Sequence, residues 1–161
     1  MARTGEAETS YRVSANAVAL GEKGVLIRGR SGAGKSSLAL ALVEAWRRQG
    51  DFARLVGDDC VLARIRGGRA VLSPHRAISG LAEWRGIGIL SQDYEKSVVL
   101  ALIVDLEPDE GRAARPRLPE PEELCSDFHG LHEVPRLSLP ARETERSVAA
   151  VMAFLHKVST K

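Results

Sequence analysis

The sequence contains few cysteines and few aromatic residues, and it has almost no net charge. Two of the 161 residues are cysteine, and 4% are aromatic. Two cysteines are too few for the disulfide framework of small secreted proteins, so a reducing compartment, the cytoplasm, is expected. A formal net charge of +2 excludes the strongly basic surface typical of proteins that bind nucleic acid, and no nucleic acid is expected as a partner.

Long hydrophobic runs are absent as well. The longest one, SVVLALIVDL at residues 97–106, is too short to cross a bilayer and is typical of a buried strand. No membrane is therefore expected as a partner. The composition, 44% hydrophobic and 27% charged, is that of an ordinary globular protein. Residues 1–11 are predicted to be a flexible N-terminus and residues 12–161 a single domain.

The clearest motif is a glycine-rich segment, GRSGAGKSS, at residues 29–37. It follows the apolar run GVLI and precedes a helical pattern, in the order strand, loop, helix. Glycines let consecutive backbone N–H groups surround phosphate oxygens, while a lysine reaches the outer phosphates and a serine hydroxyl binds Mg²⁺. The segment therefore predicts a P-loop that binds ATP and Mg²⁺. Its expected nucleotide-binding residues are Gly29, Arg30, Ser31, Gly32, Ala33, Gly34, Lys35, Ser36 and Ser37, of which Ser36 is also a metal ligand.

Hydrophobic periodicity and turn residues predict a mixed α/β domain with hairpins and flanking helices. After the P-loop helix, which Gly50 ends, a hairpin with the turn Gly67–Gly68 replaces the crossover helix of the commonest P-loop proteins. Residues 107–134 are expected to be mostly loop with one short helix, and an amphipathic helix begins at Thr144. Strands are expected at about 12–19 and 24–28. Within residues 53–74, one strand is expected to reach the acidic pair and two more to form the hairpin, and further strands are expected at 85–90, 98–106 and 135–139.

Two acidic residues, Asp58 and Asp59, end the strand that follows the P-loop helix. Strands on either side of such a helix tend to end at the sheet edge where phosphates bind, so both carboxylates are expected to face the nucleotide. One would contact Mg²⁺ and the other would lie near the attacking oxygen. The alternative is a solvated turn, which is as common for two acids at a strand end when no P-loop is nearby.

A third segment, EWRGIGI at residues 83–89, carries a family resemblance together with GVLIRGRSGAGKS and LVGDD. In this order the three resemble the catalytic domain of bacterial HPr kinase/phosphorylase, in the short form of alphaproteobacteria that lacks the family's separate N-terminal domain. The resemblance implies a fold of the HPr kinase and phosphoenolpyruvate carboxykinase type. It also implies ATP- and Mg²⁺-dependent phosphorylation of a serine of the carrier protein HPr, phosphate-dependent dephosphorylation, and a homo-oligomer, in that family a hexamer.

The resemblance also implies roles for single residues. Glu83 helps bind Mg²⁺, Arg85 lies in the segment needed for transfer, and Asp58 accepts the proton of the substrate serine beside Asp59, a further metal ligand. Lys35 completes the catalytic set. Without the resemblance, Glu83 and Arg85 would be interpreted as a surface ion pair.

Two arginine-bearing segments resemble further loops of the family. RPRLPEP, at residues 115–121, matches a loop that supplies an arginine to the transferred phosphoryl group, which would be Arg117. LPARETER, at residues 139–146, stands where the family has Pro-Val-Arg-Pro-Gly-Arg for dephosphorylation. Arg142 and Arg146 are the expected phosphate-binding residues there. Because this loop departs from the pattern, weak dephosphorylation is expected.

A last departure concerns Ser14, which stands where the family has a histidine. A serine does not exchange protons near neutral pH as imidazole does, so this replacement is consistent with a slower reaction or with another substrate. Two rival functions stay open: a small-molecule kinase on the same scaffold, and a nucleotide-binding sensor with little catalysis. Incubation with labelled ATP and HPr would separate them.

Overall fold

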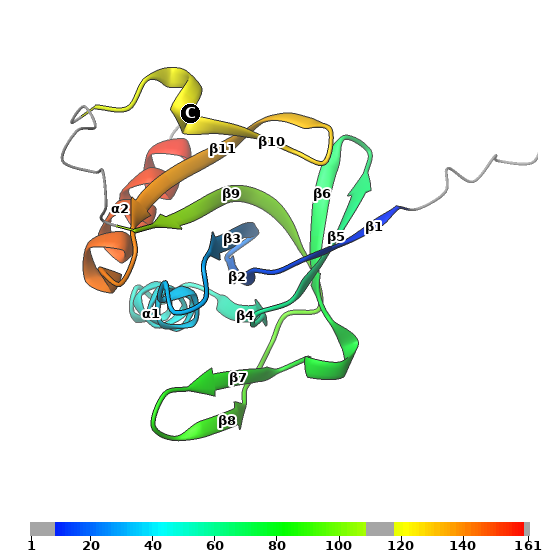
Figure 1. Cartoon of the computed structure of the whole chain (residues 1–161), viewed down its shortest axis with the longest axis vertical. Helices are drawn as coiled ribbons and strands as arrows, with labels where there is room; N and C mark the ends of the chain where they lie inside the picture. Colours follow the sequence, from blue (N-terminus) through cyan, green and yellow to red (C-terminus); the bar gives the residue numbers. More distant parts are fainter. Residues whose placement is uncertain (1–8, 109–117, 160–161) are drawn as a thin grey trace, which may run out of the picture.

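The structure, a computed structural model, describes residues 9–108 and 118–159 (Figure 1). A strongly curled sheet forms its centre, and two helices lie along one side of it. The helices are α1 (Lys35–Arg48) and α2 (Thr144–Ser159), with short 3-10 turns η1 (Arg76–Ile78) and η3 (Pro121–Leu124). The strands are β1 (Ser10–Val13), β2 (Asn16–Leu20), β3 (Lys23–Gly29), β4 (Ala53–Gly57), β5 (Val61–Arg66), β6 (Arg69–Pro74), β7 (Leu81–Trp84), β8 (Gly88–Ser91), β9 (Val98–Glu107), β10 (Cys125–Phe128) and β11 (Leu131–Pro140).

The large sheet is mixed and branches at β9. Its main order is β1-β5-β6-β9-β3-β2-β4. On one side, β9 pairs with β3 in parallel. On the other side, its first residues pair with β6 antiparallel and its last five pair with β11 in parallel, and β10 extends β11. Because β3, β9 and β11 run in the same direction, the loops that follow them leave from one edge of the sheet.

Each face of the sheet has its own hydrophobic core. Along β3, Val25 and Ile27 belong to the cluster under α1 and α2, whereas Leu26 belongs to the cluster inside the curl. All three side chains are fully buried, which stabilises the fold by about 2 kcal/mol each. The period-two alternation of the strand thus fixes which side carries the helices.

Several sequence predictions are confirmed. The helix after the glycine-rich segment spans Lys35–Arg48 and is followed by Gly50 at φ 87°. The hairpin β5–β6 turns at Gly67 and Gly68, whose φ angles of 52° and 71° suit a tight glycine turn. The second helix begins at Thr144, as its apolar spacing predicts.

Several sequence predictions differ from the structure. Residues 85–90, expected to form one strand, hold the turn of a hairpin and most of β8, because β8 pairs with β7 in a separate two-stranded sheet. The strand expected at about 12–19 is two strands, because the chain changes partners at residues 14–15: β1 pairs with β5 and β2 pairs with β3 and β4. Ser10 and Tyr11, expected in the flexible terminus, pair with Arg64 and Ala63. Part of the expected loop 107–134 belongs to the hairpin of β10 and β11, which pair antiparallel and bury Phe128 and Val134.

Among the described residues, no helix is long and apolar enough to span a membrane. Both cysteines are free, in agreement with the expected absence of a disulfide framework: Cys60 is buried and Cys125 is half-buried.

Candidate functional site

The glycine-rich segment forms the loop between β3 and α1. Gly29, Gly32 and Gly34 have φ angles of 155°, 75° and 95°, values that a residue with a Cβ rarely adopts. Gly34 is the N-cap residue of α1. No side chain forms a capping hydrogen bond at this end of the helix, and the first turn of α1 contains no acidic residue. The loop therefore offers backbone N–H groups and the positive end of a helix dipole to an anion.

The ammonium group of Lys35 lies within this loop. It donates hydrogen bonds to the carbonyl oxygens of Gly29 at 3.1 Å and Arg30 at 3.3 Å, and it is 4.0 Å from Oδ1 of Asp59. Lys35 is 8% exposed, so a cation is held almost out of water at the mouth of the loop. A charge in this position is attracted strongly to an incoming phosphate.

The two aspartates after β4 differ in exposure. Asp58 is buried, and its Oδ1 accepts a hydrogen bond from Oγ of Ser36 at 2.8 Å while its Oδ2 accepts one from the N–H of Glu83 at 2.9 Å. Asp59 has φ 59°, and its side chain is 66% exposed. The turn thus directs one carboxylate beneath the loop and the other toward solvent.

A further side chain, Asn16, is joined to the same group. Its Nδ2 donates to Oδ1 of Asp58, and its Oδ1 accepts a hydrogen bond from the N–H of Asp59 at 3.2 Å. Sequence reasoning missed this residue. The available signal was a single polar side chain in the otherwise apolar run ANAVAL, residues 15–20.

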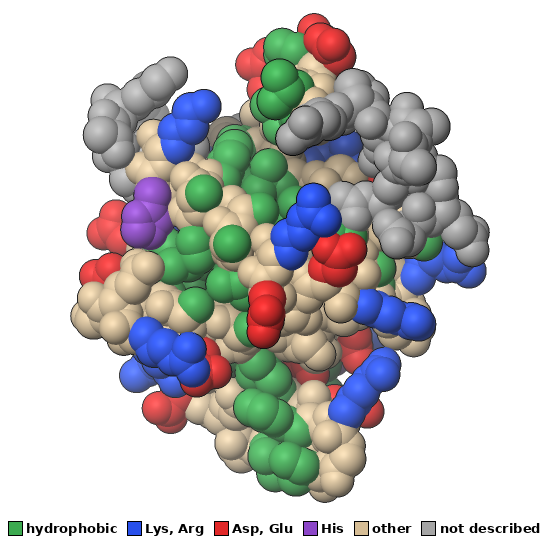
Figure 2. Space-filling view, turned by 90° about the vertical axis from the view of Figure 1, so that its left-hand side faces the viewer, with side chains coloured by type: hydrophobic (Ala, Val, Ile, Leu, Met, Phe, Trp, Pro, Cys, Tyr) green, Lys and Arg blue, Asp and Glu red, His purple; other side chains and the backbone are tan. Residues whose placement is uncertain are grey.

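The hairpin β7–β8 forms a separate two-stranded sheet beside the loop. It carries Glu83 and Arg85, and Ile87 and Ile89 on it are each 69% exposed. Figure 2 shows hydrophobic side chains gathered at the bottom of the molecule, where this hairpin projects. Glu83 is paired with Ile89 across the hairpin, so an apolar surface lies beside a carboxylate of the site.

These parts surround a hollow of about 1090 Å³, which is large enough for a nucleotide. The glycine-rich loop and one side of α1, along its whole length from Lys35 to Arg48, form one wall, and the hairpin forms another. Among the residues predicted for the site, it is lined by Gly29, Ser31, Gly32, Gly34, Lys35, Ser36, Ser37, Asp59, Glu83 and Arg85. Ser14, the residue that replaces the family histidine, also lines it.

Two arginines from other segments of the chain, Arg85 and Arg142, lie close to the glycine-rich loop. Arg142 donates from Nε to the carbonyl oxygen of Gly32 at 3.0 Å and from its backbone N–H to that of Ala33 at 2.9 Å. A Cβ atom at Gly32 would lie 3.7 Å from Nη2 of Arg142 and 3.9 Å from Nη2 of Arg85. The two guanidinium groups therefore meet over Gly32, although they come from different loops.

The other two predicted arginines are placed differently. Arg146 lies on the first turn of α2, where it pairs with Glu143 at 3.3 Å, and it does not line the hollow. Arg117 lies outside the described residues. The structure thus brings Arg142, but not Arg146, to the glycine-rich loop.

The available ligands suit a magnesium ion. They are oxygen atoms, those of the Ser36 hydroxyl and of the carboxylates Asp59 and Glu83, which hard cations prefer. Within the described part of the chain, no group of three or more His, Cys, Asp or Glu side chains could hold a metal by itself. This agrees with the usual binding of Mg²⁺, in which a few protein oxygens act together with substrate phosphates.

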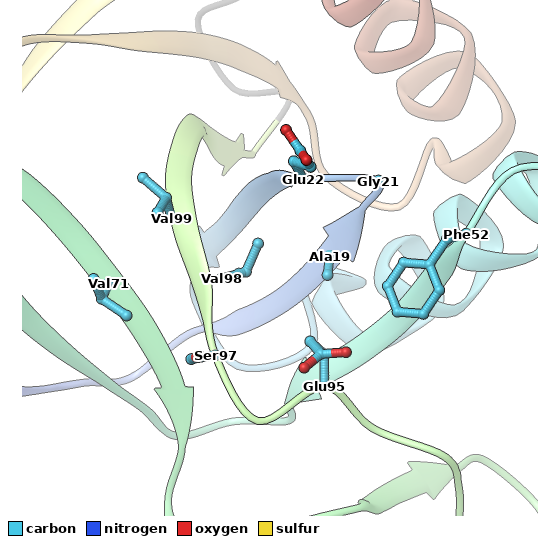
Figure 3. A pocket seen from close by; sticks show the side chains of 9 residues that line it. All are labelled: Ala19, Gly21, Glu22, Phe52, Val71, Glu95, Ser97, Val98 and Val99. Atoms are coloured by element: carbon cyan, nitrogen blue, oxygen red, sulfur yellow. The ribbon is translucent and has the colours of Figure 1, made fainter.

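A smaller hollow of about 270 Å³ lies near Gly21 and the first residues of β9 (Figure 3). Its lining includes the carboxylates of Glu22 and Glu95 and no lysine or arginine. Negative charge without a cation repels phosphate, so this hollow is unsuited to a nucleotide.

An ion-pair network ties together the parallel strands behind the loops. Arg28 on β3 binds Asp105 on β9 through two hydrogen bonds of 2.7 and 2.8 Å, and Arg136 on β11 donates to Asp105 at 2.5 Å and to Glu107 at 3.2 Å. Burial alone would raise the pKa of Asp105, but the hydrogen bonds and positive charges of Arg28 and Arg136 outweigh it, and the pKa is lowered. Asp105 therefore remains a carboxylate that holds three strands in register.

Comparison with known proteins gives consistent matches. The model of the HPr serine kinase C-terminal domain matches residues 7–160. The HPr kinase/phosphorylase of Geobacillus thermodenitrificans is 36% identical over 127 residues, which are 74% of this chain and 38% of that protein, and the one from Exiguobacterium is 34% identical over 130 residues, with the same coverage. The chain thus spans less than half the length of these relatives. The structure of the Hpr(Ser) kinase/phosphatase from Coxiella burnetii superposes with a TM-score of 0.72 at 22% identity, over 93% of this chain and 91% of that one, and it shares the fold.

Proposed function

Because the chain belongs to the HPr serine kinase C-terminal domain family, we propose that it transfers the γ-phosphoryl group of ATP, with Mg²⁺, to a serine of HPr. The observation that carries this proposal is the single hollow in which the glycine-rich loop, Lys35, Asp59 and the EWRGIGI hairpin meet. A nucleotide held by the loop would present its outer phosphate to the hairpin. The substrate protein would bring its serine hydroxyl to that phosphate beside the hairpin.

The residues divide into phosphate-binding and metal-binding groups. The loop N–H groups, the start of α1 and Lys35 would hold the β- and γ-phosphates. Ser36 and Glu83 would hold Mg²⁺, and Asp59, which lines the same hollow, would contribute a third oxygen. When bound, Mg²⁺ supplies positive charge that neutralises the phosphate oxygens during transfer.

The proton of the substrate serine needs an exposed acceptor. The resemblance implies Asp58, but both of its oxygens already accept hydrogen bonds from Ser36, Glu83 and Asn16. We therefore assign the proton to Asp59, which lines the hollow, and assign to Asp58 the orientation of the Ser36 hydroxyl.

In the proposed step, the serine oxygen forms a bond to the γ-phosphorus while the bond from that phosphorus to the β–γ bridging oxygen breaks. The serine proton passes to the Asp59 carboxylate, and ADP leaves. Arg85, for which no hydrogen bond or ion pair is found within the described residues, supplies positive charge to the moving phosphoryl group. Arg117 is proposed to act in the same way from a segment outside the described residues.

The dephosphorylation reaction is proposed to be weak. In it an oxygen of inorganic phosphate forms a bond to the phosphorus of phosphoserine while the bond from that phosphorus to the serine oxygen breaks, so that pyrophosphate and the serine hydroxyl are the products. This reaction brings two anions together and so depends on cations around the loop. Arg142 is in place, but Arg146 is engaged by Glu143, and Glu145 adds a further negative charge. The loop that matches the family's dephosphorylation loop is therefore less positive here.

Incubation of the protein with γ-labelled ATP and purified HPr tests the proposal. Acid-stable label on a serine of HPr is expected, and Lys35→Ala is expected to abolish it because the loop loses its buried cation. Label on a small hydroxyl compound instead would indicate a small-molecule kinase on this scaffold. Tight nucleotide binding without transfer would indicate a sensor. The presence of Ser14 in the hollow favours this alternative function, because a serine does not exchange protons near neutral pH as a histidine does. Sedimentation of the same sample measures whether the chain forms the homo-oligomer, a hexamer, that the resemblance implies.

A further inference from the structure

Asn16 is the first residue of β2 and the one polar side chain in that strand, Asn-Ala-Val-Ala-Leu. It is 0% exposed, and the strand is buried along its whole length. A carboxamide taken out of water is strongly destabilising unless its donors and acceptor find partners. Where these partners lie therefore indicates what the residue does.

All of the hydrogen bonds found for the Asn16 carboxamide lead to the candidate site. Nδ2 donates to Oδ1 of Asp58 and to Oγ of Ser36, the latter at 3.2 Å. Oδ1 accepts a hydrogen bond from the N–H of Asp59 at 3.2 Å. The orientation of the amide is fixed by these partners, because the flipped amide would place its oxygen against the Asp58 carboxylate and its NH₂ against a backbone N–H.

Through these contacts one side chain controls both aspartates. It holds the carboxylate of Asp58, which in turn accepts a hydrogen bond from the hydroxyl group of Ser36 at 2.8 Å. It also holds the backbone of Asp59, whose φ of 59° is unfavourable for a residue with a Cβ and needs support from its surroundings. Loss of the carboxamide would remove one of the three hydrogen bonds that hold the Asp58 carboxylate, and it would remove the side-chain support of the turn that carries Asp59.

We propose that Asn16 is a positioning residue, which acts through Ser36 and the aspartate pair to make the site ready for a magnesium-bound nucleotide. Its role rests on the proposed function, since it concerns the same hollow. Partners that orient metal ligands commonly change metal affinity or activity by about 10- to 100-fold when they are removed. The effect expected from Asn16 is therefore on the Mg²⁺-dependent part of nucleotide affinity, and not on nucleotide binding as such.

The test compares Asn16→Leu and Asn16→Thr with Val18→Ala. Leucine has a similar size and no polar atoms, and threonine retains one hydroxyl that can donate to Asp58. Val18, two residues further along β2, is fully buried in the cluster under the helices, so its truncation destabilises the same strand without removing a contact to the aspartates. The affinity of a fluorescent ATP analogue is measured for each protein with Mg²⁺ and with EDTA, and thermal unfolding is followed in parallel.

In the wild type, Mg²⁺ is expected to strengthen binding of the analogue. Asn16→Leu should lose this strengthening by about tenfold or more while its affinity in EDTA stays within about twofold, with Asn16→Thr in between and Val18→Ala unchanged. An Asn16→Leu protein that keeps the full Mg²⁺ effect, or loses no more of it than Val18→Ala at equal thermal stability, would overturn the role of Asn16 alone. A wild type that binds the analogue with Mg²⁺ but does not phosphorylate HPr would contradict the proposed substrate and would leave the role of Asn16 intact.

Discussion

Nε of Arg142 donates a hydrogen bond to the carbonyl oxygen of Gly32 at 3.0 Å, which ties the loop after β11 to the glycine-rich loop after β3. The backbone N–H of Arg142 adds a second bond, to Ala33, at 2.9 Å. The two loops leave neighbouring regions of one sheet edge, and their contact is made by a residue at φ 64°. The shape of the glycine-rich loop therefore depends on a segment more than a hundred residues away in the chain.

Arg142→Ala should weaken ATP binding without unfolding the protein. The backbone bond to Ala33 does not depend on the side chain, whereas the bond to Gly32 and the positive charge over it are lost. We expect kcat/KM for ATP to fall by about tenfold, the size of one charge-assisted hydrogen bond. Arg146→Ala is the matched control, because Arg146 pairs with Glu143 outside the hollow, and a change of less than about twofold is expected. An equal loss in both variants would show that general positive charge matters and not the contact to Gly32.

The two aspartates should respond differently to the same substitution. Asp59→Asn removes an exposed proton acceptor, so transfer should fall by about a hundredfold or more. Mg²⁺-nucleotide affinity should fall by less than in Asp58→Asn, because Ser36 and Glu83 remain and the asparagine amide still offers an oxygen to the metal. Asp58→Asn leaves Ser36, Glu83 and Asn16 with a poorer acceptor, so Mg²⁺-dependent affinity should fall by about tenfold or more. Single-turnover transfer and nucleotide binding are measured for both. Asp58→Asn with normal affinity and no transfer would return the proton to Asp58, as the resemblance implies.

The acidic start of α2 should limit the dephosphorylation reaction. Glu143→Gln would free Arg146 from its ion pair, and Glu145→Gln would remove a second negative charge from the same turn. The double variant should release pyrophosphate from phosphoserine-HPr and millimolar phosphate several times faster than the wild type. The forward reaction with ATP serves as the internal control and should change by less than about twofold. Equal changes in both directions would argue against a specific effect on phosphate.

Acid should remove the stabilisation that Asp105 provides. Its pKa is lowered in the folded protein, so the unfolded chain binds more protons and stability rises with pH. The contribution is fully present above the unfolded pKa, about 3.9, and is lost as the pH falls through the folded pKa. Asp105→Asn should reduce the free energy of unfolding by about 2 kcal/mol at pH 6, and by less at pH 3.5. Urea unfolding at both pH values measures this loss of free energy. Glu44→Gln is the control, because it breaks only the exposed pair with Arg48, and its free energy of unfolding should change by about 0.5 kcal/mol or less.

The parts of the fold that the sequence predicted are those determined by neighbouring residues. The helix Lys35–Arg48 follows from apolar spacing and a terminal glycine, and the β5–β6 hairpin follows from the pair Gly67–Gly68. The break between β1 and β2 was not predictable in this way, because it occurs where the chain leaves one partner strand for another. Strand pairing of this kind is set by residues far away in the sequence.

The candidate site was predictable to the same degree. Three motifs in order identify the loop, the aspartates and the hairpin, but they do not state which of two adjacent acids is exposed. That depends on the positive φ of Asp59 and on the buried Asn16, neither of which leaves a motif. The contact between Arg142 and Gly32 likewise exists only once β11 has joined β9.

The parallel arrangement of β3, β9 and β11 also bears on how the protein folds. The ion pairs that cross it join Arg28 to Asp105, 77 residues apart, and Asp105 to Arg136, 31 residues apart. Contacts of such large sequence separation require long loops to close first, which slows folding. The hairpins β2–β3, β5–β6, β7–β8 and β10–β11, in contrast, close locally and can form early. During synthesis the residues that line the hollow, which lie between Ser14 and Gln92, would emerge before Arg142, so the glycine-rich loop would gain its contact with the segment after β11 only near the end of the chain.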